Sequence, residues 1–330
     1  MPDASPPVAI VGAGPTGIAC AIALQRRDVA AICYDKGGIL DSIYHFPEEM
    51  VWFSSRDLLD IAGVPFTTPH AHPTRLETLA YYRGVAERFS VRIEPQTEIV
   101  DAKRSGEGFA VEARRGGAAC AFSARAVVVA TGFFHNPKRL DVPGCTLPLV
   151  HSRYVSGFPF HGRRVVVVGG KNSAAEAALD LYRHGASVTM IVRRGGISEK
   201  VKYWIKPDLE NRIRDGVIGA HFHTRVVEIR PGAVLASGPA GETVIPADAV
   251  FSLIGYEPDF AFLERLGIAL RGERREPEHD AESLESNVPG IYLAGAVLSG
   301  SDTGRIFIEN SRHHADRIAA AIAGPARVHA

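Results

Sequence analysis

Residues 8–35, VAIVGAGPTGIACAIALQRRDVAAICYD, decide the fold of this chain. An apolar run over residues 8–11 is short enough to be a buried parallel strand. The turn GAGPTG follows, then an Ala-rich helical stretch over residues 18–26 and a second apolar run that ends at Asp35. Strand, turn, helix, strand and terminal acid in this order predict a Rossmann-like unit of the α/β class.

The three glycines of this turn have separate physical roles. Gly12 permits the tight turn, Gly14 lets the backbone approach a pyrophosphate, and Gly17 lets the helix pack close to the strand. The helix N-terminus directs unpaired N–H groups and a positive dipole end at the phosphates. Asp35 follows about 20 residues later, where a carboxylate accepts from both ribose hydroxyls. We therefore predict a dinucleotide site rather than a Gly-rich loop of an ordinary α/β domain.

Length and charge bound the class of protein. The 330 residues favour about two domains. Lys and Arg together number 37, as do Asp and Glu, which argues against a nucleic-acid or membrane-surface partner recognised by bulk charge. No apolar run approaches the roughly 20 residues that span a bilayer, and the polar, Pro-rich start MPDASPP resembles neither a signal peptide nor an anchor.

Cysteine and histidine spacing gives no sign of a metal site. The cysteines contain no CxxC pair and no metal-ligand spacing: they are Cys20, Cys33, Cys120 and Cys145. Cys20 lies in the first predicted helix and Cys33 in the second predicted strand, so we expect both in the core. His70 and His72 form an HxH without a third ligand nearby. The pattern favours a cytoplasmic protein without structural disulfides or bound metal.

The segment after Asp35 is rich in aromatic residues but has no steady period. The candidates to cover a flat ring system are Tyr44, His45, Trp52, Phe53 and Ser54. A satellite hydrophobic cluster is an equally good interpretation. Further on, Thr74 and Glu77 have the spacing of a capping box at the start of a helix. Short alternating runs over residues 91–94, 98–101, 109–113 and 120–122 predict a small antiparallel layer.

A buried strand over residues 126–132 ends in Thr131 and Gly132. Such a strand end commonly marks where the carboxyl edge of the sheet meets the dinucleotide. The final section, from about residue 290, reads as a strand, a Gly/Ser/Asp loop and a closing helix, and we expect it to rejoin the first unit.

A second glycine turn begins at Gly169, after an apolar strand over residues 163–168. Lys171 replaces the middle glycine of the pattern and brings a cation. No acid ends the next strand; Arg193 and Arg194 stand there instead. Paired guanidiniums bind a 2′-phosphate with forked donors, whereas a carboxylate repels it, so NADPH is favoured over NADH. The alternative is two solvated surface arginines.

Two units with a returning tail imply nested domains. We predict a discontinuous FAD-binding domain over residues 1–136 and 256–330, with an NADPH-binding domain over residues 137–255 inserted between its parts.

Three stretches now suggest a family. The nested units resemble the low-molecular-weight thioredoxin reductase group of FAD-dependent pyridine-nucleotide oxidoreductases. Within that group, SIYHFPEEMVWFSS (42–55), VVVVGGKNSAAEAALDL (165–181) and IFIENSRHHADRIA (306–319) resemble the bacillithiol-disulfide reductase family. The likeness covers nearly the whole chain, and the motif GGKNS is fairly specific. The resemblance also implies a homodimer.

The resemblance assigns candidate cofactor residues. Those for FAD are Gly12, Gly14, Pro15, Thr16, Asp35, Lys36, Tyr44, His45, Thr131, Gly132, Gly295, Ala296, Ile308 and Glu309. Those for NADPH are Gly169, Gly170, Lys171, Asn172, Ser173, Arg193 and Arg194, with Gly255 as a further cofactor-binding position.

The departures from the resembled families concern redox chemistry. Thioredoxin reductases carry a CxxC in the inserted domain, where this chain has Cys145 alone. Bacillithiol-disulfide reductase-like proteins carry a cysteine in the first glycine turn, where this chain has Thr16, whose hydroxyl cannot form a mixed disulfide. The usual Gly-Asp near the tail strand is Gly295-Ala296 here, and Asp302 is a candidate replacement for the acid.

The pattern as a whole predicts an NADPH-dependent flavoprotein oxidoreductase. Electrons would pass from NADPH to FAD and then to an unidentified small-molecule or small-protein acceptor. His313 and His314 are the candidate proton donors, because histidine titrates near working pH. One alternative is a flavin monooxygenase, whose linker the stretch with His151, Ser152 and Tyr154 resembles. Another is a flavoprotein sensor or binding module without turnover.

Overall fold

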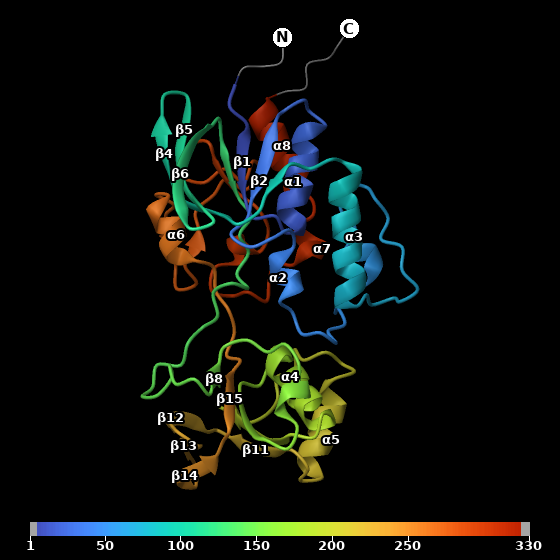
Figure 1. Ribbon diagram of the computed structural model, residues 1–330, viewed down its shortest axis with the longest axis vertical. Helices are drawn as coiled ribbons and strands as arrows, with labels where there is room; N and C mark the ends of the chain where they lie inside the picture. Colours follow the sequence, from blue (N-terminus) through green and yellow to red (C-terminus); the bar gives the residue numbers. More distant parts are fainter. Residues whose placement is uncertain (1–4, 325–330) are drawn as a thin grey trace. The chain divides into compact units, whose positions relative to one another are not determined.

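The computed structural model describes residues 5–324, which form two compact units (Figure 1). The first unit contains residues 5–45, 50–136 and 257–324, and the second contains residues 46–49 and 137–256. The predicted boundaries placed residues 46–49 in the first domain, but the backbone N–H of Glu48 donates to the carbonyl of Val155 in the second unit, at 2.9 Å. The outermost predicted residues, 1–4 and 325–330, lie outside the described range.

A five-stranded parallel sheet lies at the centre of the first unit, in the order β18, β7, β1, β2, β3. Its strands are β1 (Val8–Val11), β2 (Ala31–Tyr34), β3 (Ile93–Glu94), β7 (Val127–Val129) and β18 (Ile291–Leu293). All residues of β1, β7 and β18 are buried, as expected for strands covered on both faces. The strand order reverses at β1, and ligands bind outside the carboxyl ends of strands at such a reversal.

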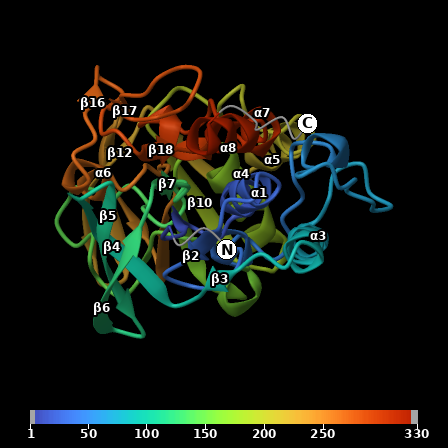
Figure 2. The ribbon, with the colours of Figure 1, turned by 90° about the horizontal axis from the view of Figure 1, so that it is seen from above.

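Helix α1 (Pro15–Gln25) connects β1 to β2 and packs beside α8 (His314–Ala323) (Figure 2). It begins at Pro15, earlier than the predicted start at residue 18, because proline fits the first helical turn, where an N–H has no partner anyway. Cys20 and Cys33 are fully buried, which confirms their place in the core. Burial raises the pKa of the Cys20 thiol to about 12.

The outer layers of the first unit also follow the sequence. The predicted capping box is confirmed: Thr74 Oγ1 accepts from the N–H of Glu77, and Glu77 Oε2 accepts from the N–H of Thr74, at 3.3 and 2.8 Å. It opens α3 (Arg75–Arg88). The antiparallel layer consists of β4 (Thr97–Ser105), β5 (Gly108–Arg115) and β6 (Ala118–Ala124). The run over residues 91–94, predicted for this layer, instead contributes β3, which pairs parallel with β2. Shorter elements are α2 (Asp41–Tyr44), α6 (Phe260–Arg265), α7 (Ile308–Ser311), β16 (Leu270–Arg271), β17 (Glu276–Pro277) and the 3₁₀ helices Arg56–Leu58 and Gly295–Ser299.

The second unit repeats this architecture. Its parallel sheet has the order β11, β10, β9, β15, β8, with β8 (Val150–His151), β9 (Arg164–Val168), β10 (Ser187–Val192), β11 (Gly219–Phe222) and β15 (Ala249–Ser252). The remaining elements are a 3₁₀ helix (Phe158–Phe160), α4 (Asn172–Arg183), α5 (Lys206–Arg214), β12 (Arg225–Arg230), β13 (Ala233–Gly238) and β14 (Gly241–Pro246). The predicted class of two nested Rossmann-like α/β units is confirmed.

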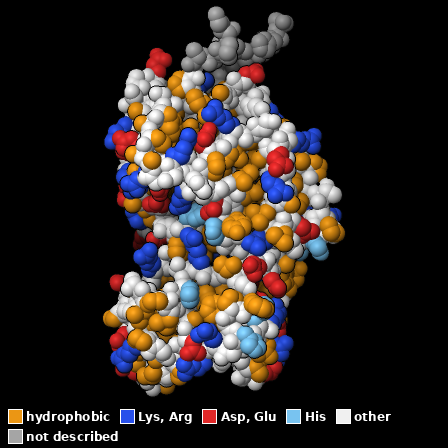
Figure 3. All heavy atoms as spheres, in the orientation of Figure 1, with side chains coloured by type: hydrophobic (Ala, Val, Ile, Leu, Met, Phe, Trp, Pro, Cys, Tyr) orange, Lys and Arg blue, Asp and Glu red, His pale blue; other side chains and the backbone are white. Residues whose placement is uncertain are grey.

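No helix within residues 5–324 is long and apolar enough to cross a membrane. On the face drawn in Figure 3, Lys and Arg are interspersed with Asp and Glu, in keeping with their equal numbers in the sequence.

Candidate functional site

The first glycine turn lies at the carboxyl end of β1 and is sterically restricted at two of its three glycines. Gly12 has φ +109°, and a Cβ there would lie 2.6 Å from the carbonyl oxygen of Ala130. A Cβ at Gly17 would collide with the carbonyl oxygen of Gly12. Gly14, by contrast, has no atom within 4 Å of its Cβ position. Open space in front of Gly14 is what the approach of a pyrophosphate requires.

The Asp35 carboxylate accepts hydrogen bonds from the first glycine turn and from the loop after β2. Its Oδ2 accepts from the backbone N–H of Ala13 at 2.8 Å, and its Oδ1 accepts from the N–H of Gly37 at 2.9 Å. Burial raises the pKa of Asp35, and these two hydrogen bonds oppose the rise. Each carboxylate oxygen keeps a further lone pair, so the group can still accept from a ribose hydroxyl.

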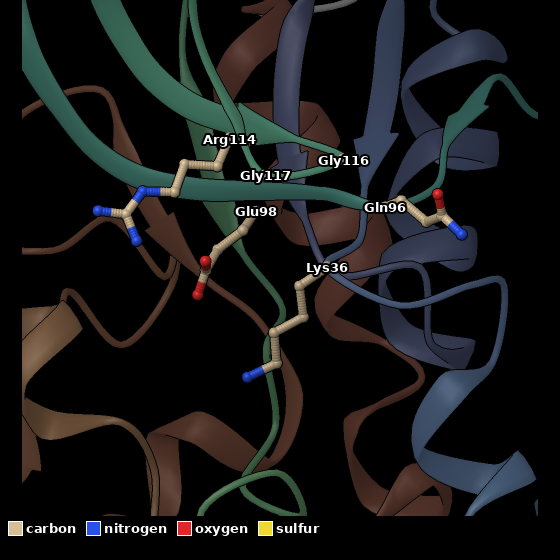
Figure 4. A pocket seen from close by; sticks show the side chains of 6 residues that line it. All are labelled: Lys36, Gln96, Glu98, Arg114, Gly116 and Gly117. Carbon is tan, nitrogen blue, oxygen red and sulfur yellow. The ribbon is translucent and has the colours of Figure 1, made fainter.

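A groove of about 510 Å³ lies beside Lys36, which follows Asp35 in the chain (Figure 4). It is lined by Lys36, Gln96, Glu98, Arg114, Gly116 and Gly117. The N–H groups of Gln96 and Thr97 donate to the carbonyls of Gly37 and Asp35, at 2.7 and 2.8 Å, which ties β4 to the loop after β2. Lys36 was a predicted site residue, whereas the residues from β4 and β5 were not, because only tertiary pairing brings them to this loop.

Thr16 and Gly295 lie together at the other side of the turn. Gly295 has φ +76°, and a Cβ there would lie 2.8 Å from Oγ1 of Thr16. Both a positive φ and the contact with Thr16 therefore require glycine at this position. Thr131 and Gly132 follow β7, which is the strand between β1 and β18 in the sheet. The carboxyl ends of β7 and β18 therefore both lie on the same side of the turn that follows β1.

His314 forms a hydrogen bond with the backbone of the same glycine. Its Nδ1 accepts from the backbone N–H of Gly295 at 3.1 Å. Burial lowers the pKa of His314 to about 4, aided by the charges of Arg317, His279 and His313. The expectation that His314 titrates near neutral pH is therefore wrong: the ring is neutral at pH 7 with Nδ1 occupied. His313 is exposed at the start of α8.

Other predicted residues of the first unit are more peripheral. Tyr44 is 61% exposed, so it belongs to no buried aromatic cluster. Ile308 and Glu309 open α7, which lies against the 3₁₀ helix that contains Gly295 and the partly buried Ala296. The candidate acid Asp302 lies 3.8 Å from Nη1 of Arg274 in a surface ion pair.

The second glycine turn is built differently. A Cβ at Gly169 would lie 2.5 Å from the carbonyl oxygen of Leu253, and one at Gly170 would lie 2.7 Å from Cγ1 of Val192. Ala174 occupies the place that Gly17 has in the first turn, so α4 tolerates a methyl group where α1 does not. Lys171 is exposed and immediately precedes α4.

Asn172 holds the loop that follows β10. Its Nδ2 donates to the carbonyl of Lys200 at 3.1 Å, and its Oδ1 accepts from the N–H of Lys202 at 2.9 Å. The N–H of Ser198 donates to the carbonyl of Gly170 at 2.9 Å, and the buried ammonium of Lys202 pairs with Glu176. The side chain of Asn172 therefore connects the glycine turn to the loop, and its contact with cofactor stays a prediction. Residues 198–202 were not among the predicted site residues.

The cations of this turn lack acidic partners. Lys171, Arg193 and Arg194 are exposed, and within the described part of the chain no carboxylate forms an ion pair with any of them. Ser173 is exposed beside them, and Gly255 follows β15 at the same sheet edge. Unneutralised cations around a glycine turn at a helix N-terminus favour a phosphate-rich ligand.

Two of the linker residues that suggested a monooxygenase, His151 and Tyr154, pack within the second unit. His151 belongs to β8 and stacks on Phe251 with ring centroids 5.0 Å apart. Burial lowers the pKa of His151. The hydroxyl of Tyr154 donates to Asp180. Packing and hydrogen bonding account for these residues without a ligand.

This chain is similar in sequence and structure to known reductases. Residues 9–295 match the family model described as pyridine nucleotide-disulphide oxidoreductase. Bacilliredoxin reductase Bdr of Bacillus subtilis is 36% identical over 316 residues, 95% of this chain and 96% of that protein. The structure of bacillithiol disulfide reductase Bdr (YpdA) from Bacillus cereus has a TM-score of 0.94 and 38% identity, covering 97% of this chain and 99% of that one. The Staphylococcus aureus structure of the same name has a TM-score of 0.92 and 32% identity, with coverage of 96% and 98%.

Proposed function

The chain belongs to the pyridine nucleotide-disulphide oxidoreductase family, with bacillithiol disulfide reductases among its relatives, and we propose that it passes electrons from NADPH through FAD to its acceptor without a protein thiol. Family membership confirms the predictions of a reductase and of FAD and NADPH as cofactors. The assignment of individual residues, the acceptor and the thiol-free route are the proposal, as are a homodimer and a cytoplasmic location.

The residues of each unit fit one cofactor. Open space at Gly14 and the acceptor oxygens of Asp35 fit the pyrophosphate and ribose of FAD in the first unit. Lys171 with Arg193 and Arg194 fits the phosphates of NADPH in the second. When bound, the two cofactors supply hydride transfer from nicotinamide to flavin. The protein contributes orientation and charge, and a neutral His314 keeps Gly295 in place beside Thr16.

The position of Thr16 carries the thiol-free route. Thr16 lies in the first turn with its hydroxyl against Gly295. The side chain at this position of the turn therefore has a hydroxyl group and no sulfur. Cys20 is the cysteine nearest in sequence, and it is fully buried with a pKa of about 12, so it is a protonated thiol at pH 7. A buried thiol does not attack a disulfide.

The names of the relatives point to a low-molecular-weight disulfide or a small redox protein as the class of acceptor. For this chain we expect negligible reduction of small disulfides, because thiol exchange requires a thiolate at the turn. The acceptor is then a small molecule or small protein that takes electrons directly from reduced flavin.

Anaerobic reduction by NADPH followed by an acceptor screen tests the proposal. We expect NADPH to bleach the flavin within seconds and small disulfides to turn over slowly, with Thr16→Cys faster than wild type. Fast disulfide turnover that disappears in Cys20→Ala would contradict the thiol-free route. Fast turnover that survives Cys20→Ala would keep this route and make disulfides the acceptor. Failure of NADPH to bleach the flavin would favour the non-catalytic alternative.

A further inference from the structure

Two histidines flank one carboxylate in the first unit, away from the residues predicted as proton donors. Nδ1 of His45 and Nε2 of His135 each lie 3.3 Å from Oδ2 of Asp41. Nδ1 of His45 also lies 2.8 Å from the carbonyl oxygen of Asp41. A carbonyl only accepts, so this Nδ1 carries a proton. The ring centroids of the two histidines are 6.5 Å apart.

The cluster lies at the carboxyl edge of the sheet. The N–H of Leu40, which precedes Asp41, donates to the carbonyl of Ala13 in the first glycine turn, at 3.1 Å. His135 lies in the segment that follows β7. The first residue of that segment, Ala130, contacts Gly12. Segments from β2 and β7 therefore bring the three side chains to the end of the sheet where the turn lies.

Exposure decreases from one histidine to the other. The side chain of His45 is 41% exposed, whereas those of Asp41 and His135 are 17% and 19% exposed. His45 can exchange a proton with water, and Asp41 connects it to a ring that is mostly shielded.

Two-electron reduction of an acceptor A by NADPH consumes one proton from solution: A + NADPH + H⁺ gives AH₂ + NADP⁺. The hydride of NADPH accounts for two electrons and one hydrogen, so a further proton must reach the reduced acceptor. His314 is a poor source, because it is neutral at pH 7 and its Nδ1 is occupied by the N–H of Gly295. We propose that His45, Asp41 and His135 relay this proton from solvent to the acceptor side of the first unit. The proposal rests on the proposed function.

The transfer balances along the observed contacts. A proton that binds Nε2 of His45 releases the Nδ1 proton to Oδ2 of Asp41. Oδ2 passes a proton to Nε2 of His135, and the Nδ1–H bond of His135 breaks as the reduced acceptor gains its hydrogen. Asp41 is protonated between these two transfers, so it carries the proton from one ring to the other.

The test separates the two half-reactions. His135→Gln and Asp41→Asn keep polar side chains of similar size, and His70→Gln is the matched control, because Nδ1 of His70 also pairs with a carboxylate, Glu77, at 2.8 Å. Flavin content establishes that each variant is folded. Stopped-flow absorbance follows reduction by NADPH, then reoxidation by menadione, a naphthoquinone, in H₂O and in D₂O.

We expect His135→Gln and Asp41→Asn to be reduced by NADPH at the wild-type rate and to be reoxidised at least tenfold more slowly, within the range of general acid catalysis. Added imidazole should restore part of the rate in His135→Gln, and the solvent isotope effect on reoxidation should rise. His70→Gln should match wild type.

Equal reoxidation rates in wild type and His135→Gln would overturn the relay. Slower reoxidation without imidazole rescue or a changed isotope effect would also overturn it, in favour of a structural role. Should NADPH fail to reduce even wild type, the proposed function fails; the relay is then tested by the same reoxidation after photochemical reduction of the flavin.

Discussion

The two glycine turns occupy the same place in the same topology, yet they are specified by different side chains. In the first turn, Gly12 and Gly17 are required by contacts with backbone oxygen, and Gly14 faces open space. In the second, Gly169 and Gly170 are confined by Leu253 and Val192, and the remaining positions carry larger residues, Lys171 and Ala174.

The charges differ as well. The first turn is followed by an acid, Asp35, whose oxygens accept from backbone N–H groups of the turn and its loop. The second is followed by Arg193 and Arg194, which have no ion-pair partner in the described part of the chain. One turn therefore suits a ligand that offers hydroxyl donors, and the other suits a ligand that carries additional phosphate.

The largest expected effect comes from Gly14→Val. Gly14 has extended backbone angles, φ −78° and ψ 179°, and open space at Cβ, so valine should not disturb folding. The branched side chain would occupy the space that the pyrophosphate needs, so we expect folded, colourless protein. Circular dichroism and the flavin absorbance of the purified variant check this.

Two further variants serve as controls for Gly14→Val. Gly17→Ala should instead reduce stability, by about 1–3 kcal/mol as for other overpacked sites, because its Cβ would collide with Gly12. Lys171→Val, the equivalent of Gly14→Val in the second turn, should keep its flavin. A yellow Gly14→Val protein with a full complement of FAD would refute the assignment of the first turn.

The next effect concerns the coenzyme. Replacing Arg193 and Arg194 by alanine removes charge-assisted contacts of about 1.5–3 kcal/mol each, so the KM for NADPH should rise roughly tenfold or more. The KM for NADH should hardly change. Steady-state kinetics with both coenzymes measure the difference, with Arg214→Ala on α5 as the control. Equal losses for NADPH and NADH would mean that these arginines do not read the 2′-phosphate.

A smaller effect is expected from Asn172→Ala. The variant loses two hydrogen bonds to residues 200–202, each contributing about 0.5–1.5 kcal/mol, and so loosens the loop after the arginines. We expect a several-fold rise in KM for NADPH and faster tryptic cleavage after Lys200 or Lys202. Asn211→Ala, which removes an exposed hydrogen bond to Arg214, should change neither. Unaltered cleavage would show that Asn172 does not hold the loop.

These variants also separate what the sequence could predict from what it could not. Both turns, their strands and the arginine pair were predictable, because glycine spacing and apolar runs are local signals. Three features were not: the groove residues Gln96, Glu98 and Arg114, the hydrogen bonds of Asn172, and the contact of His135 with Asp41. Each joins segments that are distant in sequence, and no local pattern encodes which side chains meet.

His314 is the instructive error, and it leads to the smallest effect. From sequence alone it was a histidine with an ordinary pKa, but burial and neighbouring cations lower that value to about 4. Below pH 6.5 the unfolded chain therefore binds a proton that the folded chain does not. Folded stability should fall as pH is lowered from about 6.5 to about 4, with no further loss from this group below that range.

His314→Asn offers an oxygen acceptor to the N–H of Gly295 but cannot titrate. Urea unfolding at pH 7 and pH 5 should therefore show a smaller decrease in midpoint for this variant than for wild type, while His313→Asn, at the exposed neighbouring position, should behave as wild type. An identical decrease in all three proteins would mean that His314 is protonated when folded, and the first turn would lose its neutral support. The comparison of the two turns would then have to include a charge beneath Gly295 that the present geometry does not accommodate, because an Nδ1 that carries a proton cannot accept from the Gly295 N–H.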